Sequence, residues 1–245
     1  MARKRTAAAK VAYEAILEKI LSFDVAPGAT ISDSQLAEEL KMSRTPVREA
    51  MVRLTVEGLI EQGESSMFVK PMTATDIREL LEVRDALESK AVELIMATGG
   101  VSAENRAQLL YWNDQMRHHV EHNNFALNFQ ADDQFHRLLI SCADNSRLND
   151  YANQLRLQIH RVRWLTIIQP DYLSSVEEHQ AIIDELGGGD TVAALEAIKA
   201  HIRHASENFH AVIHDEHSGG LMNMITHAAL TLGQKCMLSS QSHLF

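Results

Sequence analysis

Four side chains of metal-ligand types interrupt the apolar pattern of three predicted helices in the second half of the chain. Asp132 and His136 lie four residues apart, so on a helix they share one face, and that face is otherwise apolar. His179 and His201 interrupt two later apolar patterns in the same way. A carboxylate on an apolar face is costly unless it is paired or binds a cation. One Asp and three His could therefore hold Zn²⁺, Ni²⁺ or Mn²⁺ and leave positions for water or a ligand carboxylate.

Each of these residues taken alone also has a plainer interpretation, because a single buried histidine is more often a hydrogen-bonded packing residue than a metal ligand. Asp133 would replace Asp132 if the helix phase were one residue off, and His204 and His210 lie near His201 in the sequence. The four residues together make a metal site a serious alternative to core packing, because three separate apolar patterns are interrupted by ligand types.

Arg84 falls on the apolar face of the first helix of this half. Its guanidinium is a planar fork of donors that could bind an effector carboxylate through two hydrogen bonds. An ion pair with Glu88, four residues later, explains the same position equally well.

A second kind of chemistry is indicated near the N-terminus, on a helix predicted to begin at Ser43. Arg44, Thr45 and Arg48 lie opposite its apolar side. In a DNA major groove Arg pairs with a guanine edge or a phosphate, and Thr with a base or a phosphate. Ser43 is placed to cap the helix, and Pro46 is tolerated in the first turn because its missing N–H has no helical partner there. A surface helix with ordinary arginines fits the spacing about as well.

The elements around this helix predict a winged helix-turn-helix. Two amphipathic helices precede it, the first ending before Pro27, and two short β-runs at residues 58–61 and 67–70 follow it around a polar turn. Two helices joined by a tight turn and followed by a hairpin place the second helix in the major groove. The apolar residues expected to hold the three helices together are Tyr13, Ile16, Leu17, Ile20, Leu21, Leu36, Ala37, Leu40, Val47, Ala50, Met51 and Leu54.

The remainder of the chain has helical periodicity throughout, so the fold class is mostly α: a winged helix-turn-helix followed by an all-α bundle. We expect a DNA-binding domain at 1–72, a metal- and effector-binding domain at 73–214 and a tail of unknown role at 215–245, which could form one more helix. The predicted helices of the second domain span about 75–98, 103–121, 124–143, 147–168, 172–187 and 190–214.

Composition supports two domains of different chemistry. The chain has 245 residues and a net charge of −10, but residues 1–72 carry ten Lys/Arg and ten Asp/Glu, so the whole excess of acid lies after them. All 13 histidines lie from His118 onward. Cys142 and Cys236 form no disulfide framework and suit a reducing cytoplasm. No apolar run is long enough for a membrane span, and no secretory signal is expected.

The N-terminal third resembles the DNA-binding domain of the GntR family of regulators. The resemblance covers residues 10–72 and rests above all on the run Ser-Arg-Thr-Pro-Val-Arg-Glu-Ala at 43–50, with Glu-Gly-Leu-Ile at 57–60. It implies a homodimer on an inverted-repeat DNA operator, with Arg44, Thr45 and Arg48 in contact with DNA; Ser43 and Arg53 are further candidates from the same motifs.

Three positions depart from the pattern of that family. Ser34 stands where many members carry an arginine, the wing at 61–67 has no basic residue, and Ser66-Met67 replaces a common glycine. Affinity for DNA is therefore expected to rest on the recognition helix and on the basic N-terminal arm rather than on the wing.

The second half is similar to the metal-binding version of the FadR C-terminal domain, also called the FCD domain. The matching motifs are Asp-x-x-Phe-His at 132–136, Glu-His at 178–179, His-Ile at 201–202 and Glu-x-Arg-x-x-Leu-Glu at 82–88. The resemblance implies a bundle of six or seven helices with Asp132, His136, His179 and His201 as metal ligands, zinc being the first choice, and a small carboxylate as effector.

These observations predict a ligand-responsive transcription regulator, expected to be a repressor, that acts in the cytoplasm and has no catalytic residues. Two alternatives remain at this point: a metal-dependent hydrolase that uses the Asp/His site, and a regulator that senses the metal itself. A purely structural metal is also compatible with the pattern.

Overall fold

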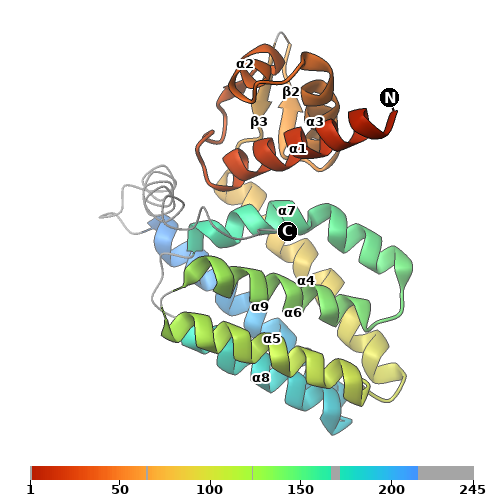
Figure 1. Cartoon of the computed structure of the whole chain (residues 1–245). Coiled ribbons are helices and arrows are strands. Elements are labelled where there is room, and N and C mark those ends of the chain that lie inside the picture. Colours follow the sequence, from red (N-terminus) through yellow and green to blue (C-terminus); the bar gives the residue numbers. More distant parts are fainter. Residues whose placement is uncertain (1, 65, 123, 167–171, 215–245) are drawn as a thin grey trace. The chain divides into compact units, whose positions relative to one another are not determined.

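A computed structural model describes residues 2–64, 66–122, 124–166 and 172–214 (Figure 1). One compact unit consists mainly of residues up to 74, with residues 157–165 added to it, and the other consists of residues 75–156 and 166–211. The predicted fold class, a winged helix-turn-helix plus an all-α bundle, is confirmed. The predicted tail at 215–245 and Cys236 lie outside the described residues.

The first unit consists of three helices and a small sheet. Its elements are α1 (Ala2–Leu21), β1 (Thr30–Ile31), α2 (Asp33–Glu39), α3 (Arg44–Val56), β2 (Ile60–Gln62) and β3 (Met67–Val69). The strands are antiparallel in the order β1-β3-β2, with Thr30 opposite Phe68 and Ile60 opposite Val69. The sequence pattern showed β2 and β3 but not β1, because a strand of two residues has no periodicity to detect.

An apolar core fastens α1 and α2 to α3. Ile16 and Ile20 of α1 are buried together with Val47 and Leu54 of α3, and β2 adds Ile60. Burial of a side chain of this size stabilises the folded state by about 1.5–3 kcal/mol. The outer face of α3 is therefore held in a defined orientation by its inner face.

The two ends of α3 follow from local chemistry, with one correction. Ser43 occupies the N-cap position as predicted, but its side chain makes no capping hydrogen bond. Pro46 is the third residue of the helix, where a backbone N–H has no partner in any case. At the other end Gly58 has a φ of +74°, a left-handed conformation that favours glycine and lets the chain turn into β2.

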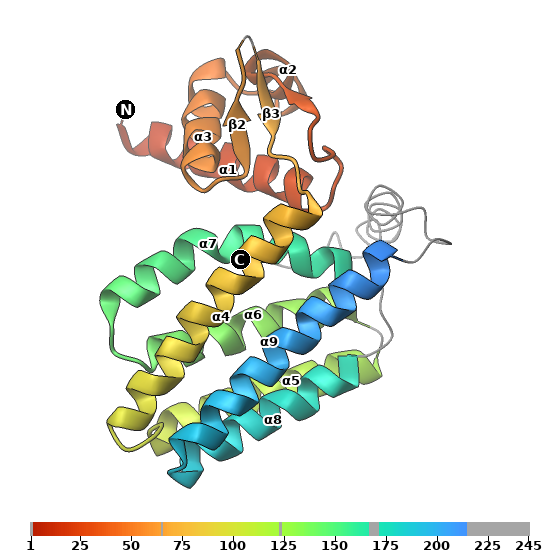
Figure 2. The same cartoon turned by 180° about the vertical axis from the view of Figure 1, so that it is seen from behind.

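The described chain after residue 73 is built from helices, most of which belong to the second unit. They are α4 (Ala74–Ala97), α5 (Ala103–Glu121), α6 (Phe125–Ser141), α7 (Ser146–Thr166), α8 (Tyr172–Gly188) and α9 (Thr191–His214), within about two residues of the predicted spans. Helices α5 and α6 lie at the front of the unit in Figure 1. Helices α4 and α9 lie on its other side, which Figure 2 shows from behind. Among the described residues no helix is long and apolar enough to cross a membrane.

One core joins five of these helices. It includes Ile95 of α4, Leu109 of α5, Phe135 of α6, Ile183 of α8 and Ile198 of α9. Because each helix buries one face here, the polar residues on those faces must also point inward. Three histidines that interrupt these faces are consequently brought into the bundle interior.

Candidate metal centre and nucleic-acid interface

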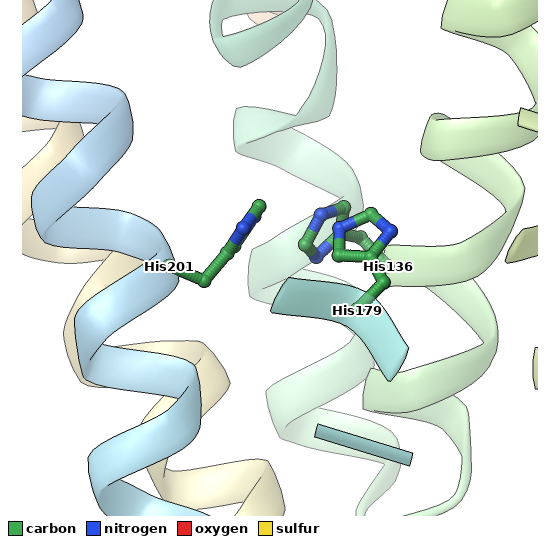
Figure 3. Close-up of side chains that lie close together, drawn as sticks. All are labelled: His136, His179 and His201. Carbon is green, nitrogen blue, oxygen red and sulfur yellow. The ribbon is translucent and has the colours of Figure 1, made fainter. Parts of the chain in front are cut away.

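Three imidazoles from three helices meet inside the bundle. His136 of α6, His179 of α8 and His201 of α9 each offer one ring nitrogen, and these nitrogens all lie within 4.8 Å of one another (Figure 3). Their exposed fractions are 6 %, 0 % and 4 %. Residues far apart in the sequence thus form one buried cluster of nitrogen ligands, which we call the histidine cluster.

Asp132 lies beside this cluster. Its Oδ1 is 3.7 Å from Nε2 of His136 and 3.7 Å from Nε2 of His179. The other candidate, Asp133, instead accepts a hydrogen bond of 3.2 Å from Arg156. The helix phase deduced from the sequence is therefore the one that places Asp132, and not Asp133, next to the imidazoles.

Two carboxylates orient the imidazoles from outside. Nδ1 of His136 lies 2.9 Å from Oε2 of Glu88, and Nδ1 of His201 lies 2.8 Å from Oε2 of Glu178. The N–H of each Nδ1 donates to the carboxylate, so each Nε2 is the nitrogen whose lone pair faces the cluster. Metal-binding histidines are commonly oriented in this way.

Glu178 also explains the position of His204, which the sequence offered as an alternative to His201. Its Oε1 pairs with Nδ1 of His204, so His204 joins the carboxylate behind His201 rather than the histidine cluster itself. The side chain of His210 lies outside the described residues. Sequence reasoning noted Glu178 only within a motif and missed its orienting role, because its partner is a side chain on another helix.

Arg84 of α4 also contacts the histidine cluster. Its Nη2 is 3.0 Å from Nε2 of His136 and 3.4 Å from Nε2 of His201, while its Nε donates to Oε1 of Glu88 at 2.7 Å. The ion pair with Glu88 is thus present, and the guanidinium also points into the bundle interior.

The electrostatics of the cluster favour a neutral His201 and an ionised Glu88. Burial, together with the neighbouring His179 and His136 and the charge of Arg84, holds the pKa of His201 well below its ordinary value. Burial opposes ionisation of Glu88, but Arg84 and His136 outweigh it and hold the pKa of Glu88 well below its usual range. Neutral His is the form that binds metal ions.

The donor set fits a divalent first-row ion. Three neutral imidazole nitrogens and one carboxylate oxygen are the protein ligands typical of Zn²⁺ sites, and Ni²⁺ and Mn²⁺ accept the same donors. Phe135 stacks on His179 with ring centroids 3.9 Å apart and planes at 6°, which further limits the orientation of that imidazole.

The outer face of α3 in the first unit is basic and exposed. Arg44 and Arg48 have exposed side-chain fractions of 60 % and 66 %, and Thr45 is exposed between them. Both guanidinium groups pair with Asp33, the first residue of α2. Hydrogen bonds from Arg44 and Arg48 lower the pKa of that carboxyl.

The other two candidates differ from this group. Ser43 is exposed at the start of α3, next to Arg44. Arg53 is also exposed, but nine residues after Arg44 it lies about half a turn around the helix. There it donates to Glu57 at 2.9 Å and its guanidinium lies 3.7 Å over the ring of Tyr13. The structure therefore groups Ser43, Arg44, Thr45 and Arg48, and leaves Arg53 apart.

Comparison with known proteins decides between the classes of function. Residues 8–69 match the family described as bacterial regulatory proteins of the gntR family, and residues 79–204 match the FCD domain. The chain belongs to the GntR family of bacterial regulatory proteins. Its second unit is an FCD domain.

Relatives of known name are regulators as well. The chain is 27 % identical to the uncharacterised HTH-type transcriptional regulator YdhC of Bacillus subtilis, over 83 % of this chain and 91 % of that protein. It is 27 % identical to the HTH-type transcriptional repressor RspR of Escherichia coli, over 80 % and 86 %. The solved structure of E. coli McbR/YncC shares the fold, with a TM-score of 0.70, 18 % identity and coverage of 83 % and 97 %.

This GntR-family chain is accordingly a DNA-binding regulator of transcription and not an enzyme. The hydrolase alternative is set aside on that ground. FCD domains often bind metal ions, and the histidine cluster is a group that could bind one.

Proposed function

We propose that this GntR-family protein is a transcriptional repressor that binds an inverted-repeat operator as a homodimer and is controlled by a small carboxylate sensed at a metal ion. The observation that carries the proposal is the histidine cluster with its oriented Nε2 atoms, since such a buried donor set has no use in DNA binding itself. Repression is suggested by the name of the relative RspR. The place of action is the bacterial cytoplasm, where the operator lies.

The DNA contacts are assigned to the outer face of α3. Arg44 and Arg48 would pair with guanine edges or phosphates, and Thr45 and Ser43 with neighbouring groups. Arg53 is placed to reach a phosphate at most, because it lies on another side of the helix. A dimer would present two such helices to half-sites about one turn of DNA apart.

Titration of the full-length protein with an operator duplex, isolated by selection from random DNA, tests this assignment. Arg44→Ala or Arg48→Ala should weaken operator binding by about 1–3 kcal/mol. Arg78→Ala, which removes an exposed arginine of α4, is the matched control and should have no effect. Equal affinity of all four proteins would refute the assignment of α3 as the recognition helix.

His136, His179, His201 and Asp132 would hold the metal ion, with Zn²⁺ as the first choice. When bound, the ion supplies a positive centre with an open position to which an effector carboxylate can bind. Glu88 and Glu178 keep two of the imidazoles in the tautomer that binds metal.

Arg84 is the proposed second contact of the effector. Its guanidinium is buried within the cluster, and it can offer a bidentate contact only by giving up its present partners. Binding of a carboxylate would therefore rearrange a buried network, and the effector can shift the protein between two states only by its difference in affinity for them. Metal-loaded protein should melt at a higher temperature with the right carboxylate, and Arg84→Lys should reduce that rise.

Direct sensing of the metal is the second candidate. Nη2 of Arg84 lies within hydrogen-bond distance of the same imidazole nitrogens that would face an ion, so the guanidinium and a metal cation compete for them. Metal-dependent operator binding without any organic ligand would favour this candidate. Operator binding that responds only to a carboxylate added to the metal-loaded protein would favour the first.

A further inference from the structure

Asp33 links Arg44 and Arg48, two of the arginines of the recognition helix. Its Oδ1 accepts a hydrogen bond of 2.6 Å from Nη2 of Arg44, and its Oδ2 accepts bonds of 3.0 Å and 2.7 Å from Nε and Nη2 of Arg48. The Asp33 side chain is 17 % exposed, whereas both guanidinium groups are mostly exposed. One carboxylate of α2 thus binds both Arg44 and Arg48, the arginines on the proposed DNA-reading face of α3.

The contact contributes little to the stability of the fold, because exposed ion pairs are screened by solvent. Its main effect is to restrict the conformations of the two arginine side chains. A free arginine side chain explores many rotamers, and holding it in one before binding removes that entropic cost from the encounter with DNA. The carboxylate occupies the Nε–Nη2 edge of Arg48, so the outward N–H groups of the guanidinium remain available to a base or a phosphate.

Charge gives a second effect. Two arginines alone would present two positive charges to the phosphates of any duplex, but together with Asp33 they present one. Hydrogen bonds from the arginines lower the pKa of the carboxyl, so it stays ionised at neutral pH. Non-specific binding depends almost entirely on such charges, whereas base readout depends on direction.

We propose that Asp33 is a specificity-determining residue, which orients Arg44 and Arg48 for base contacts and weakens their attraction to DNA of any other sequence. This inference rests on the proposed function of α3 in DNA binding. It assigns a role to an acidic residue that carries no direct contact of its own to the negatively charged duplex.

The experiment compares Asp33→Asn with Glu39→Gln in the full-length protein. Glu39 lies on the same helix and pairs with Lys19 at 2.6 Å, away from the arginines, so this control removes the same charge without touching the recognition helix. Binding to the selected operator and to a scrambled duplex is measured by fluorescence anisotropy at several salt concentrations, and a melting curve verifies that each variant folds.

Asp33→Asn should lower the ratio of operator to scrambled affinity by about tenfold, the scale of one well-directed bidentate contact. Its binding to the scrambled duplex should strengthen, and the salt dependence there should steepen by about one counterion. Glu39→Gln should leave the ratio within about twofold, and Asp33→Glu, which keeps the charge and both oxygens, should restore part of it.

The inference would be overturned if Asp33→Asn left the ratio of operator to scrambled affinity unchanged, which includes an equal weakening on both duplexes. Arg44→Ala combined with Arg48→Ala separates this failure from a failure of the proposed function. If that double variant loses operator binding while Asp33→Asn has no effect, only the role of Asp33 is wrong. If the double variant binds normally, the recognition face itself is wrong.

Discussion

At the scale of single residues, the histidine cluster depends on what stands behind each imidazole. Asp132, His136, His179 and His201 were predicted from their interruption of apolar patterns, and the structure places all four close together. Glu88 was considered only as a partner of Arg84. It binds both Arg84 and His136, and no sequence spacing could show the second contact because it joins α4 to α6.

Removal of a ligand should remove the metal. We expect about one ion per chain in the purified protein, and His136→Ala or His179→Ala should abolish it, because the three remaining donors bind a divalent ion far more weakly. His118→Ala, an exposed histidine of α5, is the control. Elemental analysis by mass spectrometry measures the content, and a metal-free wild-type protein that also takes up no added Zn²⁺ would contradict the prediction.

Removal of an orienting carboxylate should weaken metal binding without abolishing it. Glu178→Gln keeps an acceptor near His201 but loses the negative charge that favours the required tautomer. We expect metal affinity to fall about 10–100-fold, as is usual for such partners. Competition with a chromogenic chelator gives the affinity, with Glu177→Gln, the exposed neighbour on α8, as the control. Similar affinities in both variants would show that Glu178 has no such role.

At the scale of elements, the turn between α4 and α5 shows how one position limits the packing of the bundle. Gly99 and Gly100 both have positive φ values, +96° and +94°. A Cβ at Gly99 would meet nothing within 4 Å, whereas one at Gly100 would lie 2.5 Å from the carbonyl oxygen of Leu186 at the end of α8. Only the second glycine is needed for a close approach between elements.

Alanine substitutions should therefore differ in their cost. Gly99→Ala carries the conformational cost alone, about 1–2 kcal/mol, while Gly100→Ala adds a clash with backbone and should cost about 2–4 kcal/mol. Urea denaturation followed by circular dichroism gives both free energies of unfolding. A loss for Gly100→Ala no greater than for Gly99→Ala would mean that α8 moves away freely.

At the scale of the whole molecule, the buried cluster should make stability depend on pH. The pKa of His201 is lowered from 6.5 in the folded state, so the unfolded state binds more protons when the pH falls through that value. The contribution of neutral His201 to the free energy of unfolding is fully present above about pH 6.5 and is lost as the pH falls below that value. The lowered pKa values of Glu88 and Asp33 act only below their ordinary values of 4.5 and 3.8, outside this window.

Metal-free protein in chelator should accordingly be less stable at about pH 5.5 than at about pH 7.5, and His201→Asn should reduce the difference. Denaturant titrations at the two pH values provide the test, since they follow the free energy of unfolding directly. If His201→Asn shows the full wild-type difference, the pH dependence comes from other histidines.

The sequence by itself determined the helix spans, the winged helix-turn-helix, the family and the residue types of both candidate sites. These follow from periodicity and from short motifs, which are local properties of the chain. Helix phase favoured Asp132 over Asp133 but left Asp133 open as the alternative.

Only the tertiary structure decided which side chains share partners. The contact of Arg84 with two imidazoles, the tautomers held by Glu88 and Glu178, and the link from Asp33 to Arg44 and Arg48 all join different elements. Such contacts depend on how helices are packed against one another to within about an ångström, because hydrogen bonds weaken steeply with distance and angle. Periodicity specifies the face on which a residue lies but not the residue that it meets.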